Sequence, residues 1–158
     1  MQLILSAFTV LNVYLTYVAF VRIRKSKRVI QHIWTWASLF GAFVWEDLFL
    51  ICAFNALVVL FTLVVNDLRY GLLFFCLFWI VRSSGEARYF MLQQFIEPKH
   101  PPLEIDAHFD GIRRVFGNIS AHQGFILMQV FQQLILITML FLGINLLLYW
   151  NAIPAQIF

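Results

Sequence analysis

The sequence predicts an all-α integral membrane protein: a single domain over residues 1–158, built as a helical bundle with about four transmembrane helices and one or two interfacial amphipathic helices. Three observations predict this class. Hydrophobic residues make up 62% of the chain and charged residues only 12%, whereas a soluble domain carries about 25% charge. Apolar runs long enough for the roughly 30 Å hydrocarbon core recur along the chain. The Lys and Arg residues gather in clusters beside those runs.

The first apolar run predicts a transmembrane helix over residues 3–21. No basic residue precedes it, so we expect this segment to stay as an anchor and not to be cleaved as a signal peptide. A dense basic cluster follows the run: Arg22, Arg24, Lys25, Lys27 and Arg28. Such clusters are retained on the cytoplasmic side, which predicts an N-terminus on the outer side.

A second uncharged run predicts a crossing over residues 48–65, directed outward. Residues 29–47 place polar side chains on one helical face and tryptophans on the rest, a pattern typical of an interfacial amphipathic helix. The alternative is that residues 29–47 extend the second crossing into one long, tilted helix.

The third crossing is predicted over residues 70–90. Its apolar run, residues 71–81, is too short to cross alone, so the helix must continue through Arg82, Glu86 and Arg88. This continuation places charge within or just beneath the bilayer. Beyond the prolines that end this helix, residues 103–116 predict a second interfacial helix.

The last crossing is predicted over residues 122–150, with Asn118 or Ser120 as its N-cap. Four crossings leave Arg69 as the lone basic residue on the outer side, in agreement with the positive-inside rule. We therefore expect both termini outside and the basic loops in the cytoplasm, in a plasma or bacterial inner membrane. A five-span arrangement that turns at Glu46 and Asp47 would separate the basic clusters, and the rule disfavours it.

Several ionisable residues are predicted to reach a similar depth at the cytoplasmic end of the bundle, and such residues are candidates for a functional site. This candidate polar cluster consists of Glu46, Asp47, Arg82, Glu86, Arg88 and His122. The favoured interpretation is that these residues form ion pairs and finish the helices at the headgroups. The alternative is a cavity that binds a substrate or an ion.

Amide side chains deeper in the predicted spans form a candidate intramembrane polar face: Asn12, Asn55, Gln129, Gln132 and Gln133. Hydrogen bonds between helices explain them more simply than a permeation path does. The spacing of His, Cys, Asp and Glu predicts no metal site, and no cofactor is indicated.

The first functional hypothesis is a non-enzymatic subunit or accessory factor of a membrane assembly. The second is a membrane-embedded enzyme acting on a lipid or other amphiphile. In it, Arg82 or Arg88 would hold an anionic headgroup, and the acid, base or metal ligand would be Glu46, Asp47, Glu86 or His122. The third is a small transporter or channel protomer. The expected partners are the lipid bilayer and other membrane subunits or further copies of the chain. No nucleic acid is expected, because the basic residues are distributed as topology signals.

Overall fold

The computed structural model describes residues 2–25, 44–95 and 117–153. These ranges contain four α-helices and no strand, which confirms the all-α prediction for the described part of the chain. The helices are α1 (Gln2–Lys25), α3 (Trp45–Val65), α4 (Leu68–Gln93) and α6 (Ala121–Leu148). Of the predicted interfacial helices, residues 103–116 and most of residues 29–47 lie outside the described ranges; residues 45–47 form the first turn of α3.

Three of the four helices are long and apolar enough to cross a membrane: α1, α3 and α6. The helix α4 is longer than α3, but the charged residues that follow its apolar half, including Arg82, Glu86 and Arg88, lower its hydropathy. Its crossing of the membrane therefore stays a prediction.

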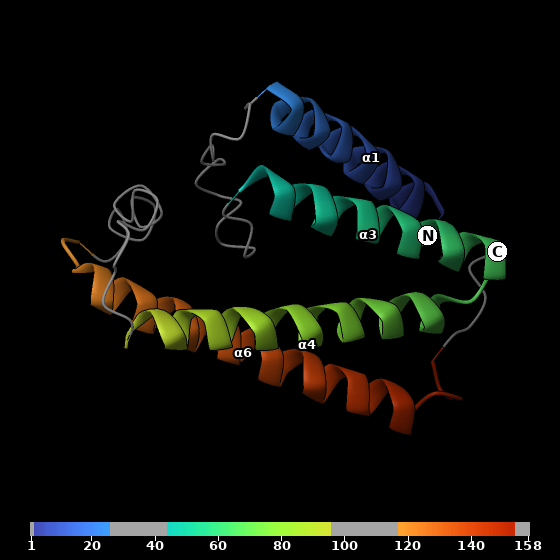
Figure 1. Cartoon of the computed structure of the whole chain (residues 1–158). Coiled ribbons are helices and arrows are strands. Elements are labelled where there is room, and N and C mark those ends of the chain that lie inside the picture. The colour runs from blue at the N-terminus through green and yellow to red at the C-terminus, as the bar shows by residue number, and fades with distance from the viewer. Residues whose placement is uncertain (1, 26–43, 96–116, 154–158) are drawn as a thin grey trace.

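The helices associate in two antiparallel pairs, α1 with α3 and α4 with α6 (Figure 1). The pairs meet mainly through α3 and α4. Between these helices, Phe54 stacks on Phe78 with ring centroids 4.3 Å apart, and Phe61 meets Phe74 edge-on at 5.5 Å. The α3–α4 contact thus holds the two pairs together.

Local chemistry explains how the helices begin and end. Asn66 ends α3 in the left-handed conformation at φ 55°, and Asp67 caps α4 by accepting a hydrogen bond from the Arg69 backbone N–H at 3.0 Å. Ser120 and Gln123 form a reciprocal capping box at the start of α6, so Ser120 is the cap of this helix.

The main buried cluster joins all four helices. It contains Ala19 of α1, residues of α3 such as Trp45 and Ile51, and Trp79 of α4, and Ile135 of α6 packs against it. A smaller cluster between α4 and α6 is centred on Phe90 and Met128. Both cysteines, Cys52 and Cys76, are buried free thiols that serve as small apolar packing residues.

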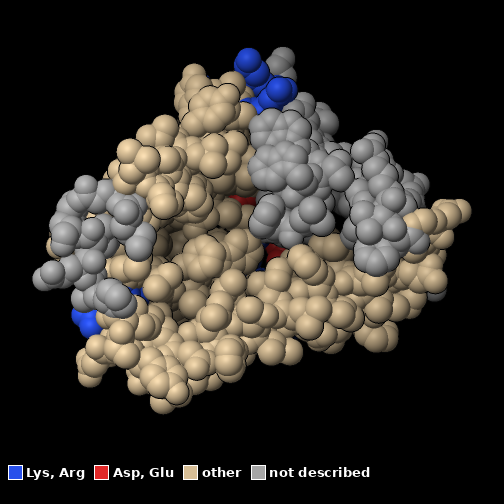
Figure 2. Space-filling model, turned by 180° about the vertical axis from the view of Figure 1, so that it is seen from behind, with Lys and Arg blue, Asp and Glu red and all other residues tan. Residues whose placement is uncertain are grey.

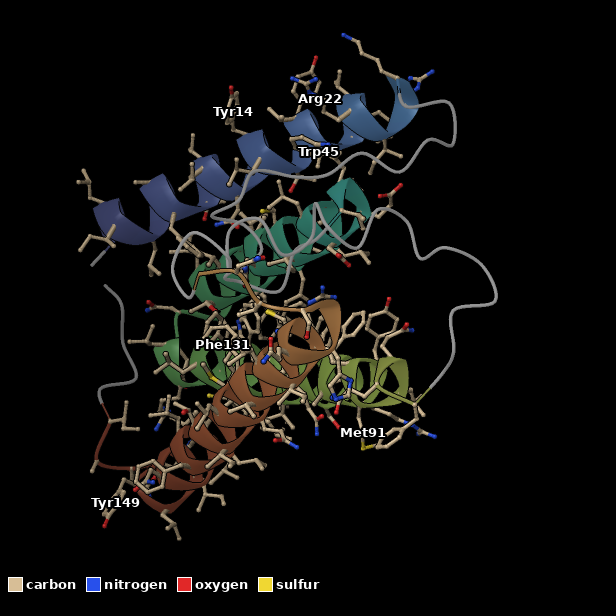
Figure 3. The ribbon with its side chains drawn as sticks, turned by 90° about the vertical axis from the view of Figure 1, so that its left-hand side faces the viewer. Tyr14, Arg22, Trp45, Met91, Phe131 and Tyr149 are labelled. Atoms are coloured by element: carbon tan, nitrogen blue, oxygen red, sulfur yellow. The ribbon has the colours of Figure 1, made fainter. Side chains whose placement is uncertain are left out.

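The surface of the bundle is strongly apolar. Tyr14 projects from α1, Met91 from α4 and Tyr149 from the end of α6, each away from its neighbouring helices (Figure 3). Val64 is 85% exposed and Leu148 is 73% exposed. Side chains of this kind on every helix suit contact with hydrocarbon.

Candidate functional site

Three of the six residues predicted to form the polar cluster come together as an ion triad of Asp47, Arg82 and Glu86, called the Arg82 triad below. Arg82 Nη2 lies 3.1 Å from Asp47 Oδ1 and 3.1 Å from Glu86 Oε1. The side chains are between 15 and 21% exposed. The triad joins the start of α3 to α4, so it links the two helix pairs.

Helix geometry brings these groups to one place. Arg82 and Glu86 have i, i+4 spacing and therefore share a face of α4. Asp47 lies in the first turn of α3, where the helix dipole stabilises a negative charge, and its Oδ2 accepts the Val44 backbone N–H at 3.3 Å. The start of α3 thus holds the Asp47 carboxylate in place independently of Arg82.

The other three predicted members of the cluster, Glu46, Arg88 and His122, are exposed. The ion pairs found within the described ranges do not include them. Adjacent helix positions differ by about 100°, so Glu46 points away from the direction of Asp47 although both have the same depth. Depth could be estimated from the sequence, but direction around the helix could not.

Only some residues of the predicted intramembrane polar face are buried in the bundle. Asn12, Asn55 and Gln132 are buried, and Gln129 is half-buried, where its Oε1 accepts a hydrogen bond from Gln94 Nε2 at 2.6 Å. This bond between α4 and α6 is of the kind expected for amides in a helical bundle. Gln133 is exposed and does not belong to the buried face.

Three buried side chains carry polar atoms that hydrogen-bond to none of the described residues: Trp79 Nε1, Ser83 Oγ and both amide atoms of Gln132. We call these three residues the polar layer. Ser83 is 0% exposed and Gln132 is 1% exposed. Buried polar groups are nearly always hydrogen-bonded in native proteins, so this layer requires an explanation.

The polar layer adjoins the Arg82 triad. On α4, Trp79 and Ser83 lie one turn apart, and Ser83 lies three residues before Glu86, so all three share one face. The antiparallel register of α4 and α6 is set by the ring contact of Phe90 with Phe125 and by the approach of Gly143 to Cys76. This register places Gln132 opposite residues 83–87. The predicted polar cluster did not include Ser83, although its i, i+3 spacing from Glu86 could have indicated that both lie on one face of α4.

A hollow opens in the middle of one face of the molecule, and acidic atoms lie in its depth (Figure 2). The acidic residues in the described ranges are Glu46, Asp47, Asp67 and Glu86. Of these, Asp47 and Glu86 are the half-buried carboxylates of the Arg82 triad, whereas Glu46 is exposed.

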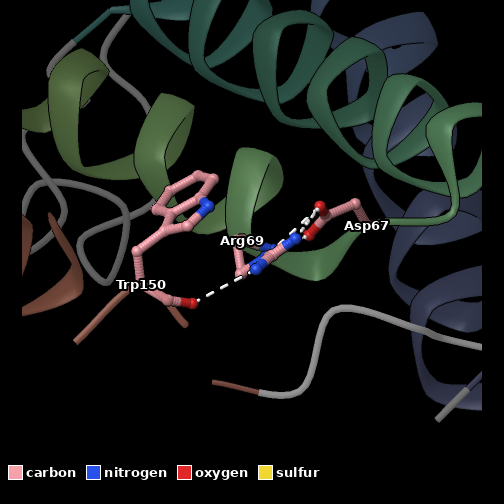
Figure 4. Close-up of polar contacts among 3 residues, drawn as sticks. All are labelled: Asp67, Arg69 and Trp150. Carbon is pink, nitrogen blue, oxygen red and sulfur yellow. Dashed lines mark hydrogen bonds and ion pairs between the residues drawn. The ribbon is translucent and has the colours of Figure 1, made fainter. Parts of the chain in front are cut away.

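A second polar cluster lies at the start of α4 and is formed by Asp67, Arg69 and Trp150 (Figure 4). It is called the Arg69 cluster below. Arg69 Nη2 lies 2.7 Å from Asp67 Oδ2, and its Nη1 donates to the Trp150 carbonyl at 3.2 Å. The guanidinium also lies 5.0 Å from the centre of the Trp150 ring. The hydrogen bond from Arg69 lowers the pKa of the Asp67 carboxyl below its ordinary value.

Sequence analysis used Arg69 as the one basic residue on the outer side, and it connected neither Arg69 nor Asp67 to Trp150. Within the described ranges, His, Cys, Asp and Glu form no group of three or more that could hold a metal ion. No protein-family model, no curated protein and no solved structure matches this chain.

Proposed function

We propose that the chain crosses a lipid bilayer four times, through α1, α3, α4 and α6. Both termini then lie outside and the basic loops lie in the cytoplasm of a plasma or bacterial inner membrane. The length and apolar character of α1, α3 and α6 support this proposal. The Arg82 triad supports the crossing of α4, because charges near the hydrocarbon core are tolerated when they pair with one another inside the bundle.

The topology is tested by single cysteines placed in a variant that lacks Cys52 and Cys76. A membrane-impermeant thiol reagent added to intact cells should label a cysteine at Asn151 and should not label one at Lys25, both of which are exposed. Labelling of both positions, or of Lys25 alone, would reject the four-span arrangement.

The function we propose is that of a non-enzymatic subunit or accessory factor of a membrane assembly. The observation that carries this proposal is the set of ion pairs in the Arg82 triad. Arg82 holds the carboxylates of Asp47 and Glu86 at once, so these charges fasten α3 to α4. An arrangement that ties two helix pairs together suits a structural role.

The apolar surface supports the same role. The helix α1 packs chiefly on α3, and it exposes large side chains such as Val10, Tyr14 and Tyr17 along its length. In a bilayer such a surface contacts either lipid or the helix of another subunit.

The subunit role is tested with photo-crosslinking side chains in the full chain, expressed in its own membrane. Crosslinkers at Tyr17 of α1 and Ile137 of α6, which are 65 and 62% exposed, should capture one constant protein partner from at least one face. A crosslinker at Ala19, which is 0% exposed, is the matched control and should capture none. Crosslinks to lipid alone from both exposed positions would reject the subunit role.

A specific observation favours a second function, that of a membrane-embedded enzyme acting on a lipid or other amphiphile. The polar layer beside Glu86 offers hydrogen-bonding groups that the described protein residues leave unused. In that function Glu86→Gln should abolish turnover of the amphiphile while the variant still folds.

A further inference from the structure

The polar layer is buried within the bundle beside the Arg82 triad. Its member Trp79 also belongs to the main buried cluster, and Ser83 and Gln132 lie between that cluster and the smaller one formed by Phe90 and Met128. Burying an amide and a hydroxyl without hydrogen bonds costs free energy, and an apolar residue at either position would avoid that cost. A ligand that supplies the absent hydrogen bonds would explain both side chains.

The unused groups define the chemistry of such a ligand. Gln132 offers an N–H donor and a carbonyl acceptor, Ser83 offers a hydroxyl that both donates and accepts, and Trp79 offers an N–H donor. A hydroxyl group also both donates and accepts, so two neighbouring hydroxyls on one ligand match this set. An ammonium group would satisfy only the acceptors.

The neighbouring charges select against an anion. Glu86 shares a face of α4 with Ser83. Asp47, on α3, is paired with the same Arg82 guanidinium as Glu86. A phosphate or carboxylate placed beside Ser83 would meet these two carboxylates, and the guanidinium that could attract it is already bound to both of them. An uncharged ligand avoids this repulsion.

Depth agrees with a ligand that belongs to the lipid–water boundary. Ser83 lies about 22 Å along α4 from Leu68, and Gln132 lies about 24 Å along α6 from Leu148, at about 1.5 Å per residue. In a hydrocarbon core of roughly 30 Å, this level is just beneath the cytoplasmic headgroups.

We propose that the polar layer and Glu86 form a binding site for an uncharged vicinal diol, carried either by the glycerol end of a monoacylglycerol or by a free polyol. Ser83 and Gln132 hydrogen-bond the two hydroxyls, and Glu86 accepts from one of them. The polar atoms of the layer are covered in this structure, so the side chains around them shift to admit the diol. The inference rests on the proposed crossings of α4 and α6 but not on the subunit role.

The test uses the full chain in phosphatidylcholine nanodiscs, with binding measured by native mass spectrometry and titration. The probes are 1-monooleoylglycerol, free glycerol, oleyl alcohol with one hydroxyl, and the anionic 1-oleoyl-lysophosphatidic acid. We expect saturable binding of one monooleoylglycerol per chain and weaker binding of the alcohol and the anion. Tight binding of free glycerol would assign the diol to a soluble polyol, and binding of monooleoylglycerol alone would assign it to a lipid.

Matched variants distinguish the site from general lipid contact. Gln132→Leu and Ser83→Ala should each weaken monooleoylglycerol binding about tenfold or more, because each removes partners of a buried hydroxyl. Gln133→Leu, next to Gln132 but exposed, should leave the affinity unchanged. Without ligand, Gln132→Leu should melt at or above the wild-type temperature, since it removes an amide that has no partner among the described residues.

Two results would overturn the proposal: no saturable binding of either diol by the wild type, or equal affinity in Gln132→Leu and Gln133→Leu. Should Gln132→Leu fail to fold, Ser83→Ala decides by the same comparison. The thiol-labelling and crosslinking experiments above do not use these probes, so failure of the topology or of the subunit role would be seen separately.

Discussion

The start and the middle of α4 handle polar groups in different ways. In the Arg69 cluster, Asp67 both caps the helix and pairs with Arg69 two residues away, and the same guanidinium reaches Trp150. Near the middle of α4, Arg82 also binds two partners, but Ser83 beside it and Gln132 opposite leave hydrogen-bonding atoms unused by the described residues.

The difference shows where polar residues are expensive. A helix end close to water can satisfy its groups locally, through caps and near neighbours in the sequence. A polar group far along a transmembrane helix needs a partner from another helix or from a ligand. In the proposed four-span arrangement, the unused groups of α4 lie well along the helix from its outer end, where no cap or near neighbour in the sequence can satisfy them.

The largest expected effect is at the Arg82 triad. Arg82→Met leaves the carboxylates of Asp47 and Glu86 without their shared cation. We expect the free energy of unfolding to fall by about 2–3 kcal/mol, which is less than for a fully buried pair because the three side chains are partly exposed. Denaturant titration in mixed micelles measures it. Adding Asp47→Asn and Glu86→Gln to Arg82→Met should restore much of the loss. A single variant as stable as the wild type would show that the triad does not fasten α3 to α4.

The next effect is at the close approach of α3 and α4 beside the Arg69 cluster. A methyl group on Gly71 would overlap Thr62 Oγ1, so Gly71→Ala should separate the helices at a cost of about 1–3 kcal/mol. Gly85→Ala is the matched control on the same helix, because its methyl meets no atom within 4 Å. The control should be neutral or stabilising by up to about 1 kcal/mol through helix propensity. Equal melting temperatures for the two variants would contradict this account.

A smaller effect is expected from pH at Asp67. Its pKa is lowered in the folded protein, so the charged form adds stability above the ordinary carboxyl pKa of about 4, and that stability is lost as the pH falls through the folded pKa. Asp67→Asn keeps a good helix cap without the charge. The melting temperature of the wild type should exceed that of the variant at neutral pH, and the difference should shrink below about pH 4. If the difference in melting temperature does not change with pH, the ion pair between Asp67 and Arg69 is not its cause.

The smallest effect is expected at the hydrogen bond between α4 and α6. Gln129→Leu removes the acceptor of Gln94 and should cost about 0.6 kcal/mol, a typical value for such bonds between membrane helices. Unfolding in the same micelles measures it, with the exposed Gln133→Leu as control. A loss several times larger would place Gln129 among the residues that the fold depends on most.

Particular residues show how far sequence reasoning reaches. The pairing of Arg82 with Glu86 follows from their spacing on one helix, and Ser120 was identified as a possible cap of α6 because caps are local. Gln132 and Gln133 are adjacent amides in one apolar run, and the sequence predicted both to belong to the intramembrane polar face. The structure buries the first and exposes the second, since which side of α6 faces α4 depends on packing between helices.

The sequence by itself determined the helical class, the apolar character of the long segments and the presence of charge late in α4, because each depends on composition and on short-range periodicity. The tertiary structure decided that Asp47 meets Arg82, that Arg69 meets Trp150, and that Glu46, Arg88 and His122 stay outside the triad. Those outcomes depend on the direction of each side chain around its helix and on the register between helices. Both are set by contacts between residues far apart in the chain.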